Sequence, residues 1–410
     1  MNLHTSIAII SDLHVGAAAR AVDLNPRPEE SKYAERDYIE KFERFVKAKD
    51  LQAAFLVVPG DITNKAAPDE FRLASKQIVR IAAALQVPSD HILFVPGNHD
   101  VDWKVLSVDP GDRSNFRLRQ RYQPFEQPEC LFAEALNRAA INAITDADCF
   151  CIWQFPEAIA VGLNSAFHDG PNDAIHHGLI PAHALSKLGA ELQKLEHTPT
   201  QIRIAVVHHH PVQYSDPISD EPDFSAMTNA ESLLKLLEEH RFDILVHGHK
   251  HVPNFNVWQV SSYFQLPILG AGSFSYLLDS RWNGLVSNQF HVLEIHERDV
   301  NTGQLLGRLV NFTYLCGHGW RESHAGNGIE HEIYFGGFRS EADLKVALQD
   351  EIRTRFSKTS FIRVSDLFAT NRDFRYVASK LMLRVLRSLA KDVGFAIHDD
   401  NLSKMLLLKE

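Results

Sequence analysis

The chain has 410 residues, of which 45% are hydrophobic and 23% charged, as expected of a globular protein with one large core and an appendage. Its net charge of −10 argues against a non-specific nucleic-acid binder, because such proteins usually carry a basic surface. No apolar run approaches the roughly 20 residues that cross a bilayer, and the N-terminus lacks the pattern of a signal peptide. The cysteines, Cys130, Cys149, Cys151 and Cys316, form no CxxC pair. Together these features predict a reduced, cytoplasmic protein without a membrane partner.

The first two-thirds of the chain alternates short apolar runs with amphipathic stretches. Strands are predicted near residues 6–12, 53–60, 91–96, 159–164, 202–208 and 243–247. Helical spacing of apolar residues predicts helices near 37–50, 70–85, 183–196 and 230–240. Continuous apolar strands between amphipathic helices indicate an α/β fold whose sheet is covered on both faces.

Other segments depart from this alternation. Residues 101–150 are polar and aromatic with little periodicity, which predicts an inserted cap or loop, and residues 211–228 form a second long loop rich in Pro and Asp. From about residue 264 the chain turns β-rich, with a hairpin expected around the Asn-Thr-Gly of 301–303. Residues 339–410 show helical patterns and a mildly basic balance. We expect a main domain over 1–338 and a small helical C-terminal module over 339–410.

Five of the apolar runs end in side chains that bind metals: AIISDLH, VVPGDITN, ILFVPGNHD, IRIAVVHHHP and DILVHGHKH. In open α/β sheets, ligands bind beyond the carboxyl ends of the strands, so these residues are expected to converge. Oxygen and nitrogen donors without thiolates suit one or two transition-metal ions rather than a zinc finger. Asp61 is the lone carboxylate of its motif and is suited to bridge two ions. The candidate donors are Asp12, His14, Asp61, Asn98, His209, His249 and His251.

Each motif alone has a simpler explanation. A Gly-Asp after a strand is usually a turn, and a histidine cluster can be a polar surface loop. The joint order, DxH, GD, GNHD, HxP and GHxH, each after an apolar run, is what indicates a common site.

This ordered set resembles the calcineurin-like metallophosphoesterase superfamily over residues 6 to about 295, and its motif context is most similar to the branch with cyclic-nucleotide phosphodiesterases. The resemblance implies a four-layer α/β/β/α sandwich and a centre of two divalent ions, with Mn²⁺, Fe²⁺/Fe³⁺ or Zn²⁺ as candidates. One ion would be bound by Asp12, His14, Asp61 and His251. The second would be bound by Asp61, Asn98, His209 and His249. The family's usual spacing to the proline favours His209 over His208, and that choice stays open.

The resemblance also implies a mechanism. A hydroxide held between the two ions would attack phosphorus in line with the leaving oxygen. His99 would stabilise the transition state or protonate the leaving alkoxide, and Asp100 would fix the tautomer of His99. The alternative for His99 is a structural turn histidine. The expected substrate is a phosphodiester, with a nucleotide as one candidate.

Three other functions compete with a diesterase. A phosphomonoesterase or protein phosphatase would use the same site. A DNA nuclease would need a basic track, which residues 1–338 do not offer and for which the C-terminal helices are the candidate. A non-catalytic scaffold would be expected to lose ligands, yet all of the candidate positions are present.

Overall fold

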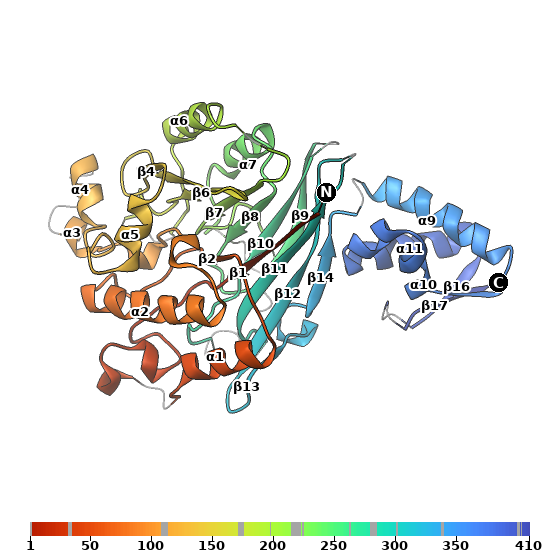
Figure 1. Ribbon diagram of the computed structural model, residues 1–410, viewed down its shortest axis with the longest axis horizontal. Coiled ribbons are helices and arrows are strands. Elements are labelled where there is room, and N and C mark those ends of the chain that lie inside the picture. Colours follow the sequence, from red (N-terminus) through yellow and green to blue (C-terminus); the bar gives the residue numbers. More distant parts are fainter. Residues whose placement is uncertain are drawn as a thin grey trace.

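Two large sheets face each other in the main body of the protein (Figure 1). The computed structural model describes residues 2–31, 35–107, 114–170, 176–196, 198–214, 223, 225–261, 264–278, 285–300, 302–337, 340–399, 402 and 404–410. Across these residues the layers are helix, sheet, sheet, helix, which confirms the predicted α/β sandwich.

The first sheet joins the N-terminal strands to the β-rich part of the chain. Its order is β13 (Gly319–Glu322), β12 (Leu305–Leu315), β11 (Asn288–Arg298), β1 (Asn2–Ile9), β2 (Phe55–Val58) and β3 (Ile92–Phe94), with β14 (Glu332–Phe335) also pairing with β12. Strands β1, β2 and β3 are parallel, so their carboxyl ends lie at one edge. Strands β11 and β12 form the predicted hairpin. The helices α1 (Tyr38–Ala48) and α2 (Pro68–Ala84) lie on the outer face of this sheet (Figure 1).

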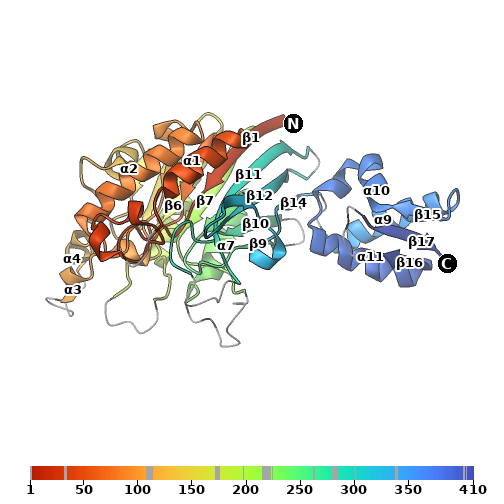
Figure 2. The ribbon, with the colours of Figure 1, turned by 90° about the horizontal axis from the view of Figure 1, so that it is seen from below.

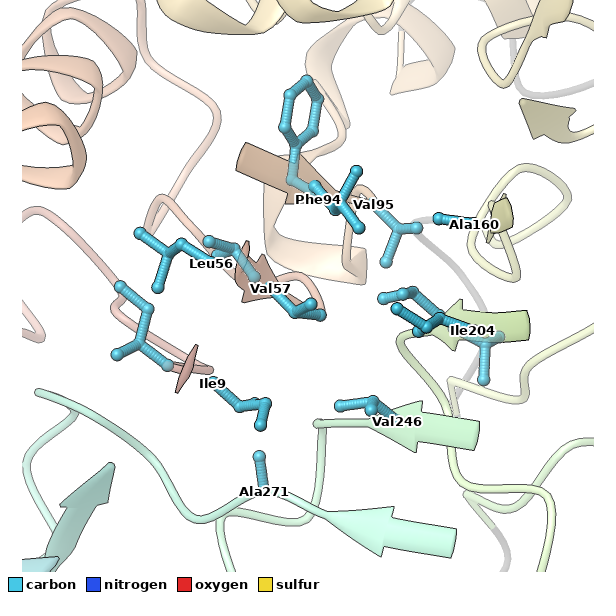
Figure 3. Packing of buried hydrophobic residues seen from close by; sticks show 14 of the residues in the cluster. Ile9, Leu56, Val57, Phe94, Val95, Ala160, Ile204, Val246 and Ala271 are labelled. Carbon is cyan, nitrogen blue, oxygen red and sulfur yellow. The ribbon is translucent and has the colours of Figure 1, made fainter. Parts of the chain in front are cut away.

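The second sheet has the order β4 (Ile141–Ala143), β5 (Phe150–Gln154), β6 (Ala158–Leu163), β7 (Ile202–Val207), β8 (Ile244–His247), β10 (Phe264–Gly270) and β9 (Asn254–Ser261). Strands β6, β7, β8 and β10 are parallel. On its outer side lie α6 (Ala182–Leu192) and α7 (Ala230–Glu239). Figure 3 shows the apolar layer between the sheets, where Ile9 and Val57 of the first sheet face Ile204 and Val246 of the second.

The segment 101–150 is built into the main body. It contains α3 (Lys104–Ser107), α4 (Asn115–Gln120), α5 (Leu131–Asn137) and β4, while residues 108–113 lie outside the described part. Tyr122 and Phe132 are fully buried in the main core. The buried Arg121 donates hydrogen bonds to the backbone oxygens of Phe167 and Asp169, so the segment is fastened to the loop that follows β6.

The C-terminal residues surround a second hydrophobic cluster. They form α9 (Glu341–Phe356), β15 (Phe361–Arg363), α10 (Val364–Thr370), α11 (Ser379–Val393), β16 (Phe395–His398) and β17 (Leu406–Lys409). The helices agree with the sequence patterns, and the three strands, which form a small sheet of order β15-β17-β16, were not predicted. Figures 1 and 2 show this unit beside β14 at one end of the sandwich. The predicted boundary at residues 338–339 lies outside the described residues.

Short 3-10 turns complete the described structure: Val22–Leu24, Pro28–Glu30, Ser89–His91, Asn98–Asp100, Ala325–Asn327 and Arg372–Tyr376. Within the described ranges, no helix has the length and apolar character needed to cross a membrane.

Candidate metal centre

The loops that follow β1 and β2 run side by side at the edge where the parallel strands end. The backbone N–H of Asp12 donates to the oxygen of Gly60 at 3.2 Å, and that of His14 donates to the oxygen of Asp61 at 2.9 Å. The loop after β8 joins them, because the N–H of His249 donates to Asp12 Oδ1 at 3.1 Å. Three motifs distant in sequence are therefore held together by backbone hydrogen bonds.

A first group of donors consists of Asp12, His14, Asp61 and His251, whose candidate ligand atoms all lie within 4.8 Å of one another. His14 Nε2 lies 3.5 Å from Asp61 Oδ2, and His251 Nε2 lies 3.7 Å from Asp12 Oδ1. Two ligand atoms that each stand about 2.1 Å from one ion are separated by about 3.0–3.5 Å, so these distances approach those of a metal site.

A second group consists of Asp61, His208 and His249, with Asn98 between them. His208 Nε2 lies 3.3 Å from Asp61 Oδ1 and 3.1 Å from Asn98 Oδ1. His249 Nδ1 lies 3.2 Å from Asn98 Oδ1 and 3.3 Å from His208 Nε2. Asp61 turns Oδ2 toward the first group and Oδ1 toward the second, which is the position expected of a bridging carboxylate.

The triple histidine enters the second group through His208. The predicted ligand, His209, instead places Nδ1 2.7 Å from Ser165 Oγ, and it is absent from both groups of converging donors among the described residues. The physical reason is the register of β7. His208 is the first residue beyond that strand, and its Nδ1 lies 2.9 Å from the oxygen of Pro59 in the neighbouring loop. His208 is thus the histidine of the triple that converges with Asp61 and Asn98. His209 stays a candidate donor, because among the described residues its Nε2 is buried without a hydrogen-bond partner and its ring centroid lies 4.4 Å from that of His249.

The backbone is strained where these donors lie. Asp12, His14, Asp61, His249 and His251 adopt the left-handed region, with φ of 50, 47, 49, 74 and 59°. Side-chain-bearing residues rarely occupy this region, and each instance costs on the order of 1–3 kcal/mol. Such strain persists only where the surroundings over-determine it, and it is typical of binding and active sites.

Two motif glycines permit the close approach of the loops. A Cβ atom at Gly97 would stand 2.2 Å from Asp61 Oδ1, and one at Gly248 would stand 2.2 Å from Ser11 Oγ and 2.7 Å from Asp12 Oδ2. Any larger residue in the GN or GH motif would therefore displace a carboxylate of the site.

Burial sets the electrostatics of the carboxylates. Burial, together with the nearby charge of Asp61, raises the pKa of Asp12 to about 7, although His208 opposes the shift. Burial also acts to raise the pKa of Asp61, but the charges of His208 and His99 hold it well below its usual range. Burial disfavours the charged form of His208, yet Asp61 raises the pKa of this histidine to about 9. Two buried carboxylates so close together call for a compensating positive charge.

The other histidines of the cluster are held neutral. Burial lowers the pKa values of His14 and His249, and neighbouring histidines add to the effect. Neutral imidazole is the form that binds metals. Within the described part of the chain, both ring nitrogens of His14 are buried without a hydrogen-bond partner, which is costly unless another ligand satisfies them. The donor set thus fits divalent cations.

His99 and Asp100 have separate environments. His99 is partly exposed, its N–H donates to Asp61 Oδ1 at 2.9 Å, and its Nδ1 lies 3.0 Å from the backbone oxygen of Asn64. Asp100 accepts backbone N–H groups of Gly97, Ile62 and Thr63 at 2.9, 3.1 and 2.8 Å. The expectation that Asp100 fixes the tautomer of His99 is corrected: the carbonyl of Asn64 faces Nδ1, and Asp100 ties the GD loop to the GNHD turn.

Sequence reasoning missed Tyr276. Its ring centroid lies 4.6 Å from that of His14 and 4.5 Å from that of His251, so it lies against the imidazoles of the first group. It follows β10 in a Ser-Phe-Ser-Tyr run that carries no recognisable metal or catalytic pattern. Only its place after an apolar strand could have marked it.

Other polar side chains near the cluster have partners of their own. Asn164 Nδ2 donates to the oxygen of Ile144 at 2.8 Å and its Oδ1 accepts the N–H of Ala166, so it caps the end of β6. Asp223 pairs with His210 at 2.9 Å and with Lys250 at 2.5 Å. The cation of the HGHKH motif is thus neutralised beside the cluster.

Comparison with known families agrees with this geometry. The family profile of calcineurin-like phosphoesterases matches residues 5–253, which is more than half of the chain. The protein belongs to this family of metallophosphoesterases. A comparison with curated proteins gave no match.

Solved structures of similar fold include the purple acid phosphatase PPD1 of yellow lupin, with a TM-score of 0.44 and 11% identity, covering 76% of this chain and 52% of that chain. Phosphopantetheinyl hydrolase of Mycobacterium tuberculosis has a TM-score of 0.35 and 16% identity, with coverages of 67% and 91%. A putative 5'-nucleotidase of Staphylococcus aureus has a TM-score of 0.37 and 12% identity, with coverages of 74% and 52%. The chain thus spans about half the length of the first and last of these proteins.

Proposed function

We propose that this protein is a metal-dependent phosphodiesterase with two divalent ions. Asp12, His14, Asp61 and His251 would hold one ion, and Asp61, Asn98, His208 and His249 the other. The observation that carries the proposal is the position of Asp61, whose two oxygens face two separate groups of donors. Divalent ions at such a site activate water as a nucleophile and neutralise the charge on phosphate oxygens.

The chain's own residues supply the remaining chemistry. His99 lies next to His14, with 4.6 Å between ring centroids, and is partly exposed, so a substrate can reach it. Because the carbonyl of Asn64 faces Nδ1, that nitrogen carries the proton of a neutral ring, and Nε2 is the atom available to the substrate. In its protonated form, His99 would deliver a proton from Nε2 to the leaving oxygen. Asp100 would keep the turn that carries His99 and Asn98 in place.

The charge of the site favours a diester over a monoester. Among the residues that the structure describes, the neighbours of the two donor groups are aspartate, asparagine, histidine and tyrosine, and Lys250 is ion-paired with Asp223. A phosphodiester carries one negative charge and a monoester close to two, so a site with little spare positive charge suits the diester. A nucleotide-type diester is the candidate that the motif context favours.

We propose a cytoplasmic location from the state of the four cysteines. All four are free thiols in the structure, three of them buried, as in a reducing cytoplasm.

The test is a substrate panel with purified protein and added Mn²⁺: bis-p-nitrophenyl phosphate, p-nitrophenyl phosphate, cyclic nucleotides and DNA. We expect the diester to turn over at least about tenfold faster than the monoester, a difference of about 1.4 kcal/mol in transition-state stabilisation. The reverse preference would indicate a phosphomonoesterase. No turnover of any substrate with Mn²⁺, Fe²⁺ or Zn²⁺ would favour a scaffold and contradict the proposal.

A further inference from the structure

The C-terminal module has a recognisable chain order. It runs α9, β15, α10, α11, β16, β17, and its antiparallel sheet places β17 between β15 and β16. Helix, strand, two helices and a two-stranded hairpin in this arrangement are the layout of a winged helix-turn-helix. In helix-turn-helix proteins the second helix of the pair lies in the major groove of DNA. Here that helix is α11.

Helix α11 has the two faces that such a role requires. Its apolar residues Met382, Val385, Leu386 and Leu389 are buried in the module's own core. The opposite face carries Lys380, Arg384, Arg387 and Lys391, all exposed. Spacings of four, three and four residues place these four cations in one stripe along the helix.

The stripe has the dimensions and charge of a DNA-binding surface. A helix of 15 residues is about 22 Å long, and the major groove admits one α-helix. Residues 340–410 contain 13 Lys and Arg and 10 Asp and Glu, whereas the whole chain has a net charge of −10. The module thus carries a small excess of positive charge, while the rest of the chain is acidic.

The acidic neighbours of the stripe are largely occupied. Arg384 pairs with Glu341 of α9 at 2.6 Å, but both side chains are about half exposed or more, and such surface pairs contribute little. Asp392 pairs with Lys345 at 2.7 Å on the side of α11 that faces α9. A polyanion can therefore displace Glu341 at low cost.

The connection between α10 and α11 is longer than the usual turn of a helix-turn-helix, spanning residues 371–378. It contacts the sandwich: Tyr376 Oη lies 3.0 Å from His296 Nδ1, and Arg372 pairs with Glu297 at 3.0 Å. The extra residues thus anchor the module beside β14. Figure 2 shows α11 on the lower side of the module.

We propose that the C-terminal module binds double-stranded DNA through the exposed basic face of α11. The net charge of the whole chain disfavours a nucleic-acid partner, but the basic C-terminal residues left that partner open. The proposal is independent of the substrate of the metal centre. Lys380, Arg387 and Lys391 would contact phosphates, and each contact releases counterions, so the affinity would fall steeply with salt.

The experiment measures anisotropy of a labelled 30-base-pair duplex of mixed sequence titrated with the full-length protein at 50–300 mM NaCl. EDTA is present, so that hydrolysis and the metal centre do not contribute. The test variant is K380Q/R387Q/K391Q. The matched control is R44Q/K76Q/K235Q, which removes three exposed cations from helices of the sandwich. Circular dichroism and bis-p-nitrophenyl phosphate turnover with Mn²⁺ establish that both variants are folded.

We expect micromolar or tighter binding at 50 mM NaCl, a loss of about tenfold or more in the test variant, and a salt slope smaller by about one for each lost phosphate contact. The control variant should bind as the wild type does. No duplex binding by the wild type, or an equal loss in both variants, would overturn the proposal. Single-stranded RNA and vesicles of phosphatidylcholine and phosphatidylglycerol serve as competing ligands, and binding to either with none to the duplex would also overturn it.

Discussion

The sandwich and the C-terminal module place their charged side chains in opposite environments. At the candidate metal centre, Asp12, His14 and Asp61 are buried on strained backbone, and their candidate ligand atoms lie within 4.8 Å of one another. On α11, Lys380 and Lys391 are exposed on a regular helix. Charges in a buried cluster interact strongly because water does not screen them, whereas exposed charges act weakly and nearly independently. Single substitutions should therefore have large effects at the centre and small ones on the module.

The largest effect is expected for Asp61→Asn. Since this carboxylate faces both groups of donors, losing its charge should lower the turnover of bis-p-nitrophenyl phosphate by about 10³-fold or more while the fold survives. Asp146→Asn is the matched control, because the side chain of Asp146 is 43% exposed and pairs with Arg119 at the surface, at 3.2 Å. Asp61→Asn activity above about a tenth of the wild-type rate would remove Asp61 from the centre.

The next largest effects should distinguish His208 from His209, the first two histidines of the triple histidine. His208→Ala should lower turnover by about 100-fold or more and reduce bound Mn²⁺, because His208 contacts Asp61 and Asn98. His209→Ala should retain the bound ions and lose about tenfold or less, because His209 supports the site through Ser165. Metal analysis and steady-state kinetics on both variants decide the assignment, and the opposite ranking would restore His209 as the ligand.

His291 tests, away from the candidate metal centre, whether a buried titratable group has a larger effect than an exposed one. It is buried in β11, its Nδ1 lies 2.6 Å from Asn311 Oδ1, and its Nε2 accepts the N–H of Gly272 at 3.1 Å. Burial lowers its pKa from 6.5 to about 4, in spite of the hydrogen bond to Asn311. The unfolded state takes up the proton more readily than the folded state does. The contribution of neutral His291 to the free energy of unfolding is therefore fully present above pH 6.5, falls between pH 6.5 and 4, and levels off below pH 4. The loss can reach about 3 kcal/mol.

Urea unfolding in EDTA between pH 7.5 and 4 measures this effect as the difference between the wild type and His291→Gln. His398→Gln, at an exposed position of β16, is the control and should follow the wild type. If His291→Gln loses stability with acid as steeply as the wild type does, His291 has no part in the pH dependence.

The smallest effect on small-substrate turnover is expected from removing the module. The candidate metal ligands all precede residue 252, and residues 344–407 supply a core of their own. A chain ending at Gly337 keeps every candidate ligand, so it should hydrolyse bis-p-nitrophenyl phosphate within about threefold of the full-length rate. A threefold change corresponds to less than about 1 kcal/mol in the activation barrier. Circular dichroism and turnover measure the outcome. An unfolded or insoluble product would show that the contacts of Tyr376 and Arg372 with the sandwich are needed for folding.

The order of elements and the convergence of the motifs were predictable from sequence. Predicted strands and helices of the sandwich lie within a few residues of those observed, because β2 and β7 are continuous apolar runs and α1 and α2 have clear amphipathic spacing. Each motif follows such a strand, so the rule that ligands bind beyond carboxyl ends was enough to bring Asp12, Asp61 and Asn98 together.

Details that depend on side-chain direction were not predictable. Counting back from Pro211 favours His209, whereas His208 is the histidine that lies against Asp61 and Asn98, so spacing alone does not decide between the two. Adjacency in sequence suggested that Asp100 orients His99, but the 3-10 turn directs Asp100 toward backbone groups of Ile62 and Thr63. The strands β15, β16 and β17 have only three or four residues each, too few for alternation to stand out beside strong helical patterns.

The central claim is that Asp61 joins two metal sites in one centre. Titration of the metal-free protein with Mn²⁺, followed by calorimetry and by turnover of bis-p-nitrophenyl phosphate in the same samples, tests it most directly. We predict two ions per chain, with activity appearing only as the second ion binds, and fewer than two ions for Asp61→Asn. Full activity with a single bound ion, or two ions bound unchanged by Asp61→Asn, would contradict the account.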